Sequence, residues 1–313
     1  MPENQTNKKQ KKLSVLITGG SGLIGKYLTS LLLAKGYSVS HLSRNENHPE
    51  GVKVFRWDPE KMMVDSKAFE GTDFIIHLAG ANIGEKRWTR KRKNEILTSR
   101  VISTRLIHKS IAEGGIRLKA FISASATGFY GAVTSSKIFA EDDPPGTDFL
   151  GSVCKKCEEA ADLFSSSGIR TVKIRTGVVL EKNDSALSKL MVPAKFGFLI
   201  QTGTGLQYMP WIHIKDLCNI YLKAIEDSAM TGAFNAAAPQ NVTHTEFMQT
   251  LARVMKVRII AVPVPGFVIR AVFGEMSDVI LKGSRVSSEK ILNSGYAFCY
   301  NMLDAALSDI VGD

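Results

Sequence analysis

The sequence has only four cysteines among 313 residues, no internal repeat, and no apolar run that could span a bilayer. Four cysteines are too few for a disulfide scaffold and are typical of a reducing compartment, so we expect a cytoplasmic protein. The longest apolar segment, residues 13–34, is interrupted by four glycines and a lysine, whereas a transmembrane helix needs about 20 consecutive apolar residues. We therefore expect no membrane partner. The missing repeat excludes solenoids and propellers.

Two of the cysteines, Cys154 and Cys157, form a C-x-x-C pair. A structural zinc site needs a second ligand pair at similar spacing, but Cys218 and Cys299 are isolated from each other. The pair also lies inside an expected helix, not at the start of one, where a thioredoxin-like motif would lie. We expect structural thiols and no metal site.

The chain carries 40 Lys and Arg against 30 Asp and Glu, which gives a net charge of +10. Much of the excess lies in two clusters, with four lysines in residues 8–12 and six cations in residues 86–93. Two interpretations remain open: a solvated tail and helix face, or a contribution to binding a phosphorylated cofactor or substrate. Nucleic acid is not expected, because no recognition motif accompanies the charge.

Short apolar runs alternate with longer helical patterns over residues 13–180. The expected strands are 13–18, 38–43, 52–57, 73–79, 118–125 and 170–180, and the expected helices are 23–36, 87–113 and 148–164. This alternation predicts an α/β fold with a Rossmann-like, doubly wound parallel sheet. Residues 1–12 lack apolar periodicity and are expected to be a disordered leader.

After residue 180 the alternation weakens. The expected helices there are 186–198, 215–228, 243–255, 267–274, 287–293 and 303–311, and the expected strands are 232–238 and 258–263. Residues 181–313 therefore predict a smaller mixed α/β C-terminal module, partly interleaved with the sheet. A chain of this length has room for two such domains.

The segment TGGSGLIG, residues 18–25, lies between an expected strand and an expected helix. It contains G-x-G-x-x-G at Gly20, Gly22 and Gly25, and G-x-x-G-x-x-G when counted from Gly19. Glycines at this spacing allow a tight turn, let the backbone approach a pyrophosphate, and let the helix pack closely on the strand. The motif predicts dinucleotide binding.

The end of the second strand indicates which dinucleotide is bound. NAD-binding proteins place an Asp or Glu there to hold the ribose 2′-hydroxyl, whereas this chain has Ser43 and Arg44. Serine can donate to a 2′-phosphate and arginine can pair with it, so NADP(H) is favoured over NAD(H). The alternative for Arg44 is a solvent-exposed turn residue.

Seven segments together resemble an atypical extended short-chain dehydrogenase/reductase family, usually described as epimerase-family or sugar-nucleotide epimerase-like proteins with a C-terminal module of unknown function. They are TGGSGLIG (18–25), HLAGANI (77–83), SASATGFYG (123–131), EDDPPGTDFL (141–150), IRTGVVL (174–180), PWIHIKDL (210–217) and VFGEMSDVILKGSRV (272–286). The resemblance covers nearly all of residues 13–313 and implies bound NADP(H). Together with Gly25 of the motif, the cofactor residues that it implies are Gly19, Ser21, Gly22, Leu23, Ile24, Ser43, Arg44, Asp58, Leu78, Ala79, Gly80, Glu95, Arg100 and Val179.

Extended members of this family use a tyrosine as general acid/base, with a lysine four residues further along and a serine or threonine near by. None of the seven tyrosines of this chain has such a lysine. The pair would fall at Val153 and Cys157, or, with a slip of one residue, at Ser152 and Lys156. In either register the phenol is missing, although a bound nicotinamide would itself perform a redox step.

Ser125 and Tyr130 are the candidate catalytic residues. Ser125 matches the family's active-site serine approximately, and its alternative is a serine that caps a loop. Tyr130 follows the same strand, and its alternatives are loop packing and a substitute acid/base. His213 is expected to be a structural histidine beside Asp216.

Two functions are consistent with these features. The leading one is an NADP(H)-binding oxidoreductase or epimerase-like enzyme that acts on an unidentified small molecule, for example a nucleotide-sugar or a carbonyl compound, bound between the carboxyl edge of the sheet and the second module. The alternative is a non-catalytic, NADP(H)-responsive binding or regulatory protein, which the missing Tyr-x-x-x-Lys favours. The oligomeric state is open, with a homodimer as one alternative.

Overall fold

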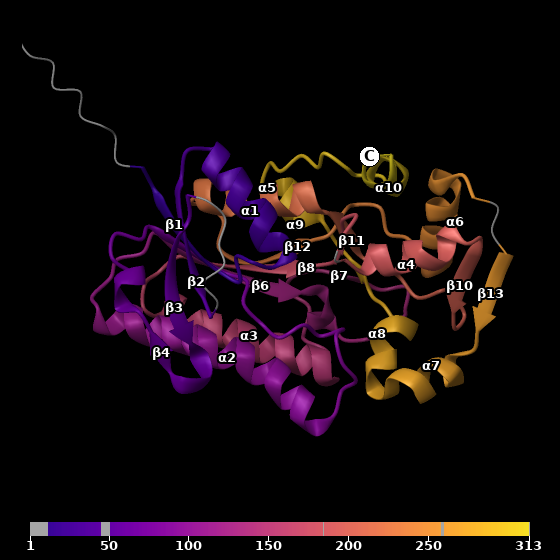
Figure 1. Cartoon of the computed structure of the whole chain (residues 1–313), viewed down its shortest axis with the longest axis horizontal. Coiled ribbons are helices and arrows are strands. Elements are labelled where there is room, and N and C mark those ends of the chain that lie inside the picture. The colour runs from indigo at the N-terminus through magenta and orange to yellow at the C-terminus, as the bar shows by residue number, and fades with distance from the viewer. Residues whose placement is uncertain (1–11, 45–50, 184, 258–259, 313) are drawn as a thin grey trace, which may run out of the picture.

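The computed structural model describes residues 12–44, 51–183, 185–257 and 260–312. Its centre is an eight-stranded sheet in the order β12-β8-β6-β5-β1-β2-β3-β4 (Figure 1). The strands are β1 (Ser14–Thr18), β2 (Ser38–Ser43), β3 (Lys53–Asp58), β4 (Met63–Val64), β5 (Phe74–His77), β6 (Ala120–Ala126), β8 (Thr171–Thr176) and β12 (Gly232–Ala236). Neighbours run parallel except β3 and β4. The predicted doubly wound α/β fold is confirmed.

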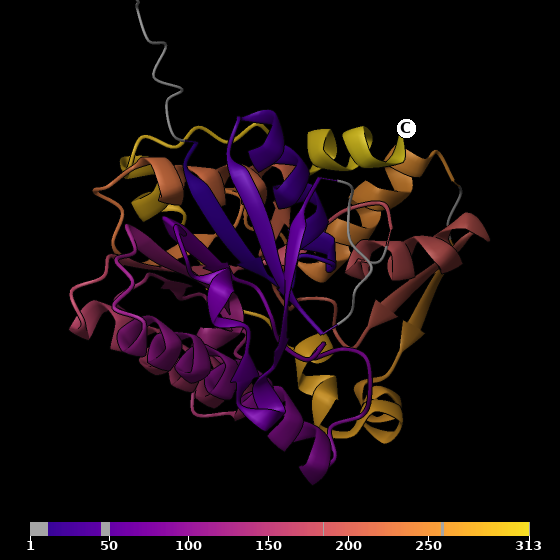
Figure 2. The same ribbon diagram turned by 60° about the vertical axis from the view of Figure 1, so that its left-hand side comes forward.

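Helices cover both faces of this sheet, because both faces of its central strands are apolar. On one face, α1 (Leu23–Ala34) and α5 (Ile214–Glu226) place Leu28 and Ile220 in a buried cluster with the strands. On the other face, α2 (Arg90–Glu113) and α3 (Phe149–Ser166) do the same with Ile107 and Phe164. Figures 1 and 2 show the sheet between these two helix layers. The strand order reverses between β1 and β5, so the ligand crevice of such a fold lies at their carboxyl ends.

The second half of the chain builds a smaller unit with its own core. There α4 (Ala186–Lys195), α6 (His244–Met255) and α10 (Leu303–Val311) pack around the buried Trp211. Two short parallel pairs accompany them, β9 (Val178–Leu180) with β11 (Trp211–His213) and β10 (Phe198–Thr202) with β13 (Ile260–Val264). The remaining elements are α7 (Gly266–Phe273), α8 (Ser277–Leu281), α9 (Glu289–Asn293), the paired strands β7 (Ile138–Phe139) and β14 (Arg285–Val286), and the 3-10 turns η1 (Pro59–Lys61), η2 (Ser66–Ala68), η3 (Thr127–Tyr130) and η4 (Gly274–Met276).

The strand expected over residues 170–180 is broken into two. At Gly177 the chain leaves the main sheet, and β9 pairs with β11 instead. A Cβ at Gly177 would lie 2.6 Å from the carbonyl oxygen of Pro210, so this crossing requires a residue without a side chain. The expectation of one continuous strand was wrong, because a periodic apolar pattern does not show which partner a strand selects.

The helix expected over residues 186–198 is shorter than predicted. It ends at Lys195, and Gly197 then adopts a φ of +80°, which stops the helix. The next residues form β10, in which an exposed Phe198 alternates with a buried Leu199. This alternation over only five residues is too short to be distinguished from the end of an apolar helix.

One strand of the second half completes the main sheet. β12 pairs with β8 from Gly232 to Ala236, and α5 packs in the same core as α1. The two halves are thus interleaved, and the boundary at residue 180 stays a prediction. Residues 1–11 of the predicted leader lie outside the described residues. Within the described part, no helix is both long enough and apolar enough to cross a membrane.

Candidate cofactor and active site

The glycine-rich turn between β1 and α1 lies at the carboxyl end of β1, beside the end of β5. Gly19 adopts a φ of +72°, and a Cβ there would lie 3.0 Å from backbone atoms of Leu78 and Ala79. Gly25 lies in the first turn of α1, where a Cβ would collide with the backbone of Gly19 and Gly20. Both contacts hold the turn tightly against the strand ends, as the motif predicts.

The N-terminus of α1 is open above Gly22. This residue is the N-cap, and it supplies no side chain to the free N–H groups of the first turn. Gly22 and Ser21 are exposed, and Leu23 and Ile24 are half-buried. A Cβ at Gly22 would meet only the carbonyl oxygen of Gly19, at 3.3 Å. The helix dipole and the free N–H groups therefore face open space that fits a cofactor pyrophosphate.

The loop after β5 lies directly against the glycine-rich turn. The Thr18 hydroxyl oxygen accepts hydrogen bonds from the backbone N–H groups of Leu78, at 3.2 Å, and Ala79, at 3.1 Å. It also lies 2.7 Å from Nδ1 of His77, whose Nε2 lies 3.0 Å from the Ser103 hydroxyl. Burial lowers the pKa of His77 to about 4, so at neutral pH an uncharged ring connects β1, β5 and α2.

The ends of β2 and β3 lie at the same edge of the sheet. β2 pairs with β1 in parallel and ends at Ser43, which is half-buried, and the following Arg44 is exposed. Asp58 ends β3, and its carboxylate caps η1 by accepting hydrogen bonds from the N–H groups of Glu60 and Lys61. Asp58 thus has a local structural role.

The predicted cofactor residues on α2 lie at different depths. Glu95 is exposed and pairs with Arg92 at 2.8 Å. Arg100 is half-buried, and its Nη1 donates to the carbonyl oxygens of Ala81 and Ile96, each at 3.0 Å. Its guanidinium also fills the space beside Gly80, where a Cβ would lie 2.8 Å from Arg100 Cζ. Arg100 and the loop after β5 are therefore brought together, whereas Glu95 faces outward.

Val179 lies in β9, where it pairs with Ile212 and packs half-buried against the core of the main sheet. The residue after this strand connects it to α1. Glu181, which is buried, accepts a hydrogen bond from the hydroxyl of Tyr27 of α1 at 3.0 Å. The second half of the chain is in this way attached to the helix that begins at the turn.

Ser125 lies half-buried at the carboxyl end of β6, and its hydroxyl donates to Oε1 of Glu158 at 2.7 Å. Arg175 of β8 binds the same carboxylate twice, through Nε at 2.8 Å and Nη2 at 2.9 Å. Glu158 and Arg175 are only 5% and 4% exposed, so each charge depends on the other. This ion pair fixes the orientation of the Ser125 hydroxyl.

Tyr130 lies at the end of η3 and is almost fully buried. Its hydroxyl donates to Oδ1 of Asn235 at 2.7 Å and accepts from Nη1 of Arg175 at 2.9 Å. Burial raises the pKa of Tyr130 to about 12. The hydroxyl therefore keeps its proton at neutral pH, and both of its hydrogen-bonding partners lie inside the protein.

The helix that carries the usual tyrosine and lysine has apolar residues at those places. Val153 and Cys157 are buried in one cluster with Ile96 of α2, whereas Lys156 is exposed. Burial raises the pKa of Cys154 to about 12 and that of Cys157 to about 11, and all four cysteines are free. Among the described residues, no group of three or more His, Cys, Asp or Glu could hold a metal ion.

His213 is buried, as expected of a structural histidine, but its predicted partner was wrong. The carboxylate of Asp216 instead accepts hydrogen bonds from the hydroxyl of Tyr296, at 2.7 Å, and from the N–H of Tyr300, at 3.0 Å. Nε2 of His213 lies 3.3 Å from Asp309, and its ring packs on Tyr300. His213 and Asp216 are close in the sequence, but the C-terminal segment supplies the side-chain partners of both.

Glu158 and Arg175 were missed in the sequence. Arg175 is a charged residue in the apolar run IRTGVVL. Glu158 follows Cys154 by four residues, which places Glu158 and Cys154 on one face of the helix. Each signal is weak alone, since a single charge in such a pattern more often faces solvent. Their pairing depends on α3 packing on β8.

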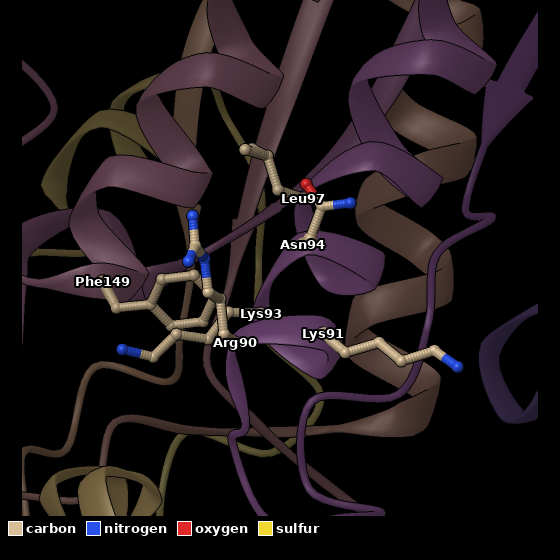
Figure 3. Close-up of a pocket in the computed structure, with 6 residues that line it drawn as sticks. All are labelled: Arg90, Lys91, Lys93, Asn94, Leu97 and Phe149. Atoms are coloured by element: carbon tan, nitrogen blue, oxygen red, sulfur yellow. The ribbon is translucent and has the colours of Figure 1, made fainter.

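A shallow hollow of about 650 Å³ lies where α2 and α3 begin (Figure 3). Its lining residues are Arg90, Lys91, Lys93, Asn94, Leu97 and Phe149. Figure 3 shows Arg90 and Lys93 beside the ring of Phe149, with Lys91 pointing away. Lys93 pairs with Glu275, and Arg90 and Lys91 form no ion pair with any described residue. The basic segment 86–93 is therefore partly paired and partly free to meet an anion.

The chain is similar to several known proteins. Residues 15–161 match the NAD dependent epimerase/dehydratase family, and residues 264–310 match a domain of unknown function. Epimerase family protein YfhF of Bacillus subtilis is 36% identical over 96% of this chain and 99% of its own length. The human epimerase family protein SDR39U1 is 34% identical over 96% of this chain and its full length.

Solved structures agree with these matches. The crystal structure of human SDR39U1 (isoform 2) with NADPH has a TM-score of 0.85 at 32% identity, and covers 96% of this chain and 100% of that one. A nucleoside-diphosphate sugar epimerase from Corynebacterium glutamicum has a TM-score of 0.78 at 31% identity, covering 96% of this chain and 59% of that one.

The fold and the glycine-rich turn define a Rossmann-fold protein of the extended short-chain dehydrogenase/reductase class. Within that class, the chain belongs to the epimerase family that includes YfhF and SDR39U1.

Proposed function

We propose that this protein binds NADP(H) and uses it in an oxidoreductase or epimerase-like reaction on a small molecule. The observation that carries the proposal is the open, uncapped N-terminus of α1 at Gly22, with Ser43 and Arg44 at the adjacent strand end. The human relative with NADPH supports the choice of dinucleotide. When bound, the nicotinamide accepts or donates a hydride.

The residues of the chain then have separate tasks. The first turn of α1 holds the pyrophosphate, and Arg44 pairs with the 2′-phosphate. Arg100 and His77 keep the loop after β5 in place, so that Leu78 to Gly80 line the crevice.

Ser125 is the better placed of the two candidate catalytic hydroxyls. It is half-buried at the carboxyl end of β6, whereas Tyr130 is buried and bonded to Asn235 and Arg175. The carboxylate of Glu158 accepts a hydrogen bond from the Ser125 hydroxyl, so the lone pairs of the serine oxygen remain available to accept a hydrogen bond from a substrate hydroxyl. Such a contact orients a substrate and does not require the missing tyrosine.

The hollow at residues 90–97 supports an anionic substrate, such as a phosphorylated compound or nucleotide-sugar. Arg90 and Lys91 are at the start of α2, and helices that follow parallel strands begin at the carboxyl edge of the sheet, where the crevice lies. Four free thiols in the native protein are consistent with a reducing, cytoplasmic compartment.

The test is pyridine-nucleotide turnover with a panel of carbonyl compounds and nucleotide-sugars. We expect turnover that is lost in Gly22→Asp, because a carboxylate at the N-cap repels the pyrophosphate, and strongly reduced in Ser125→Ala. Ser30→Asp, which adds the same charge further along α1, is the matched control. NADPH binding without turnover of any compound, and with the same affinity in Ser125→Ala, would favour the non-catalytic, NADP(H)-responsive alternative.

A further inference from the structure

The parallel pair β10 and β13 is covered along one face, whereas the opposite face is exposed at Phe198, Ile260 and Val262, half-buried at Ile200 and buried at Thr202. Leu199 is buried in the core that α4 and α6 help to form, and α4 also contacts β9, which directly follows β8 of the main sheet. The opposite face therefore points away from the main sheet, and in Figure 1 both strands lie at the margin of the molecule. Parallel sheets are nearly always covered on both faces, because neither face is polar.

The uncovered face is strongly apolar. Phe198 pairs in register with Ile260, and Ile200 pairs with Val262, so these four side chains share the face opposite Leu199. Phe198, Ile260 and Val262 are 47%, 69% and 37% exposed.

The exposed apolar surface continues into the neighbouring helices. Phe196 at the end of α4 is 75% exposed, and Phe267 and Val272 of α7 are 71% and 60% exposed. Leu281 of α8 lies next to Gly203, just after β10, and next to Gly266, at the start of α7. It thereby joins the strand pair to α7 and α8. Among the described residues, half of the twenty exposed large apolar side chains lie in residues 192–279. We call those on or next to α4, β10, β13 and α7 the apolar face, which consists of Val192, Phe196, Phe198, Ile260, Val262, Phe267, Val268 and Val272.

The charged residues within the segments that carry the apolar face are all cations. Residues 185–206 and 260–274 contain no Asp or Glu, and their cations are Lys189, Lys195 and Arg270. All three are exposed, and none forms an ion pair with a described residue. The acids that follow, Glu275 and Asp278, are already paired with Lys93 and Lys282.

The exposed apolar side chains and the three cations together indicate which kind of partner this face binds. A second copy of the chain would place the three cations opposite like cations, with no acid to pair with them, so self-association through this face is disfavoured. A surface that offers exposed aromatic and aliphatic side chains within a ring of Lys and Arg fits the headgroup region of an anionic bilayer.

We propose that the apolar face docks this protein on anionic phospholipid membranes as a peripheral contact. The sequence predicted no membrane partner because it has no apolar run that could span a bilayer, and this contact does not require one. The apolar side chains enter the headgroup boundary, and the three cations contact lipid phosphates. The proposal is independent of the proposed enzymatic function, because its apolar side chains and its three cations include no residue assigned to the cofactor, to Ser125 or to the hollow at residues 90–97.

The test is co-sedimentation of the full-length protein with vesicles of phosphatidylcholine alone or mixed with phosphatidylglycerol. We expect binding to the mixed vesicles at least about tenfold tighter than to phosphatidylcholine, and weaker binding at high salt. The double variant Phe196→Gln, Phe267→Gln should lose most of this binding but keep its melting temperature and NADPH affinity, since both side chains are exposed.

Two control variants make the result specific. Met63→Gln with Met302→Gln removes exposed apolar side chains elsewhere, 61% and 51% exposed, and should bind as the wild type does. Lys195→Glu should weaken binding to the mixed vesicles. Lys35→Glu, at the C-terminal end of α1, should not. Absence of vesicle binding, equal binding to both lipids, or equal loss in the methionine control would overturn the proposal. So would light scattering that shows a dimer dissociated by the phenylalanine pair, because the face would then join two copies.

Discussion

Glu158 of α3 and Arg175 of β8 form a bidentate ion pair inside the protein, with nitrogen–oxygen distances of 2.8 and 2.9 Å. The pair lies directly beside the hydroxyl of Ser125, so it connects the stability of the α3–β8 contact to the geometry of the candidate active site.

Removing only one of the two charges of this pair is expected to destabilise the folded protein. Glu158→Ala leaves the guanidinium of Arg175 buried without its carboxylate, and we expect the free energy of unfolding to fall by about 3 to 5 kcal/mol. Replacing both charges, with Glu158→Leu and Arg175→Met, should recover part of that loss. Urea unfolding measures both values. A double variant less stable than Glu158→Ala would contradict this account.

Arg44 is expected to set the preference for NADPH over NADH. Arg44→Ala removes the partner of the 2′-phosphate but leaves the pyrophosphate site intact, so NADPH affinity should fall about tenfold, or 1.4 kcal/mol, with NADH affinity nearly unchanged. Calorimetric titration with both dinucleotides measures the change. Arg105→Ala removes an exposed cation from the middle of α2 and should alter neither affinity. An equal loss for NADH in Arg44→Ala would exclude 2′-phosphate recognition by this residue.

Buried His77 predicts acid sensitivity of the fold. Its pKa in the native protein is about 4, below the usual 6.5, so the unfolded chain takes up a proton first as the pH falls. Its contribution to stability is complete above about pH 6.5 and is lost progressively towards pH 4, in total roughly 3 kcal/mol.

The variant His77→Gln isolates this contribution. We expect its unfolding free energy to depend less steeply on pH between 6.5 and 4 than that of the wild type. Parallel pH profiles for the wild type and His77→Gln would show that His77 protonates equally in both states.

The thiols are expected to differ in reactivity. Cys299 is exposed, whereas Cys154, Cys157 and Cys218 are buried. Burial raises the pKa of all four thiols, so access to the reagent decides which thiol reacts first. Alkylation of the native protein, followed by peptide mass spectrometry, should find Cys299 modified first and the other three only on unfolding. Rapid alkylation of the C-x-x-C pair, or its oxidation to a disulfide in the native protein, would contradict a purely structural role.

The glycine-rich turn and the central sheet were predictable because their signals are local. A turn that requires Gly19 at positive φ and Gly25 without a side chain leaves its mark within eight residues. The central strands β1 and β5 are nearly continuous apolar runs, since both of their faces are buried.

The rest depended on contacts between distant residues. β9 and β10 are short apolar runs whose partners, β11 and β13, lie further along the chain, and nothing in the runs identifies those partners. Likewise, the environment of Ser125 comes from a carboxylate on α3 and a guanidinium on β8, which come together only when both elements pack. The partner of His213 was misassigned for this reason, because Asp309 belongs to the last helix.

The return of β12 to the main sheet has a consequence for synthesis of the chain. β8 ends at Thr176 and its outer neighbour β12 ends at Ala236, so 60 residues separate the two. At about 5 to 20 residues per second, the ribosome needs roughly 3 to 12 s to deliver them. Throughout that interval β8 is an unprotected edge whose N–H and C=O groups can pair with another chain. Nascent molecules on crowded polysomes are therefore most exposed to aggregation between these two points of translation, and a chaperone that binds extended strands would act there.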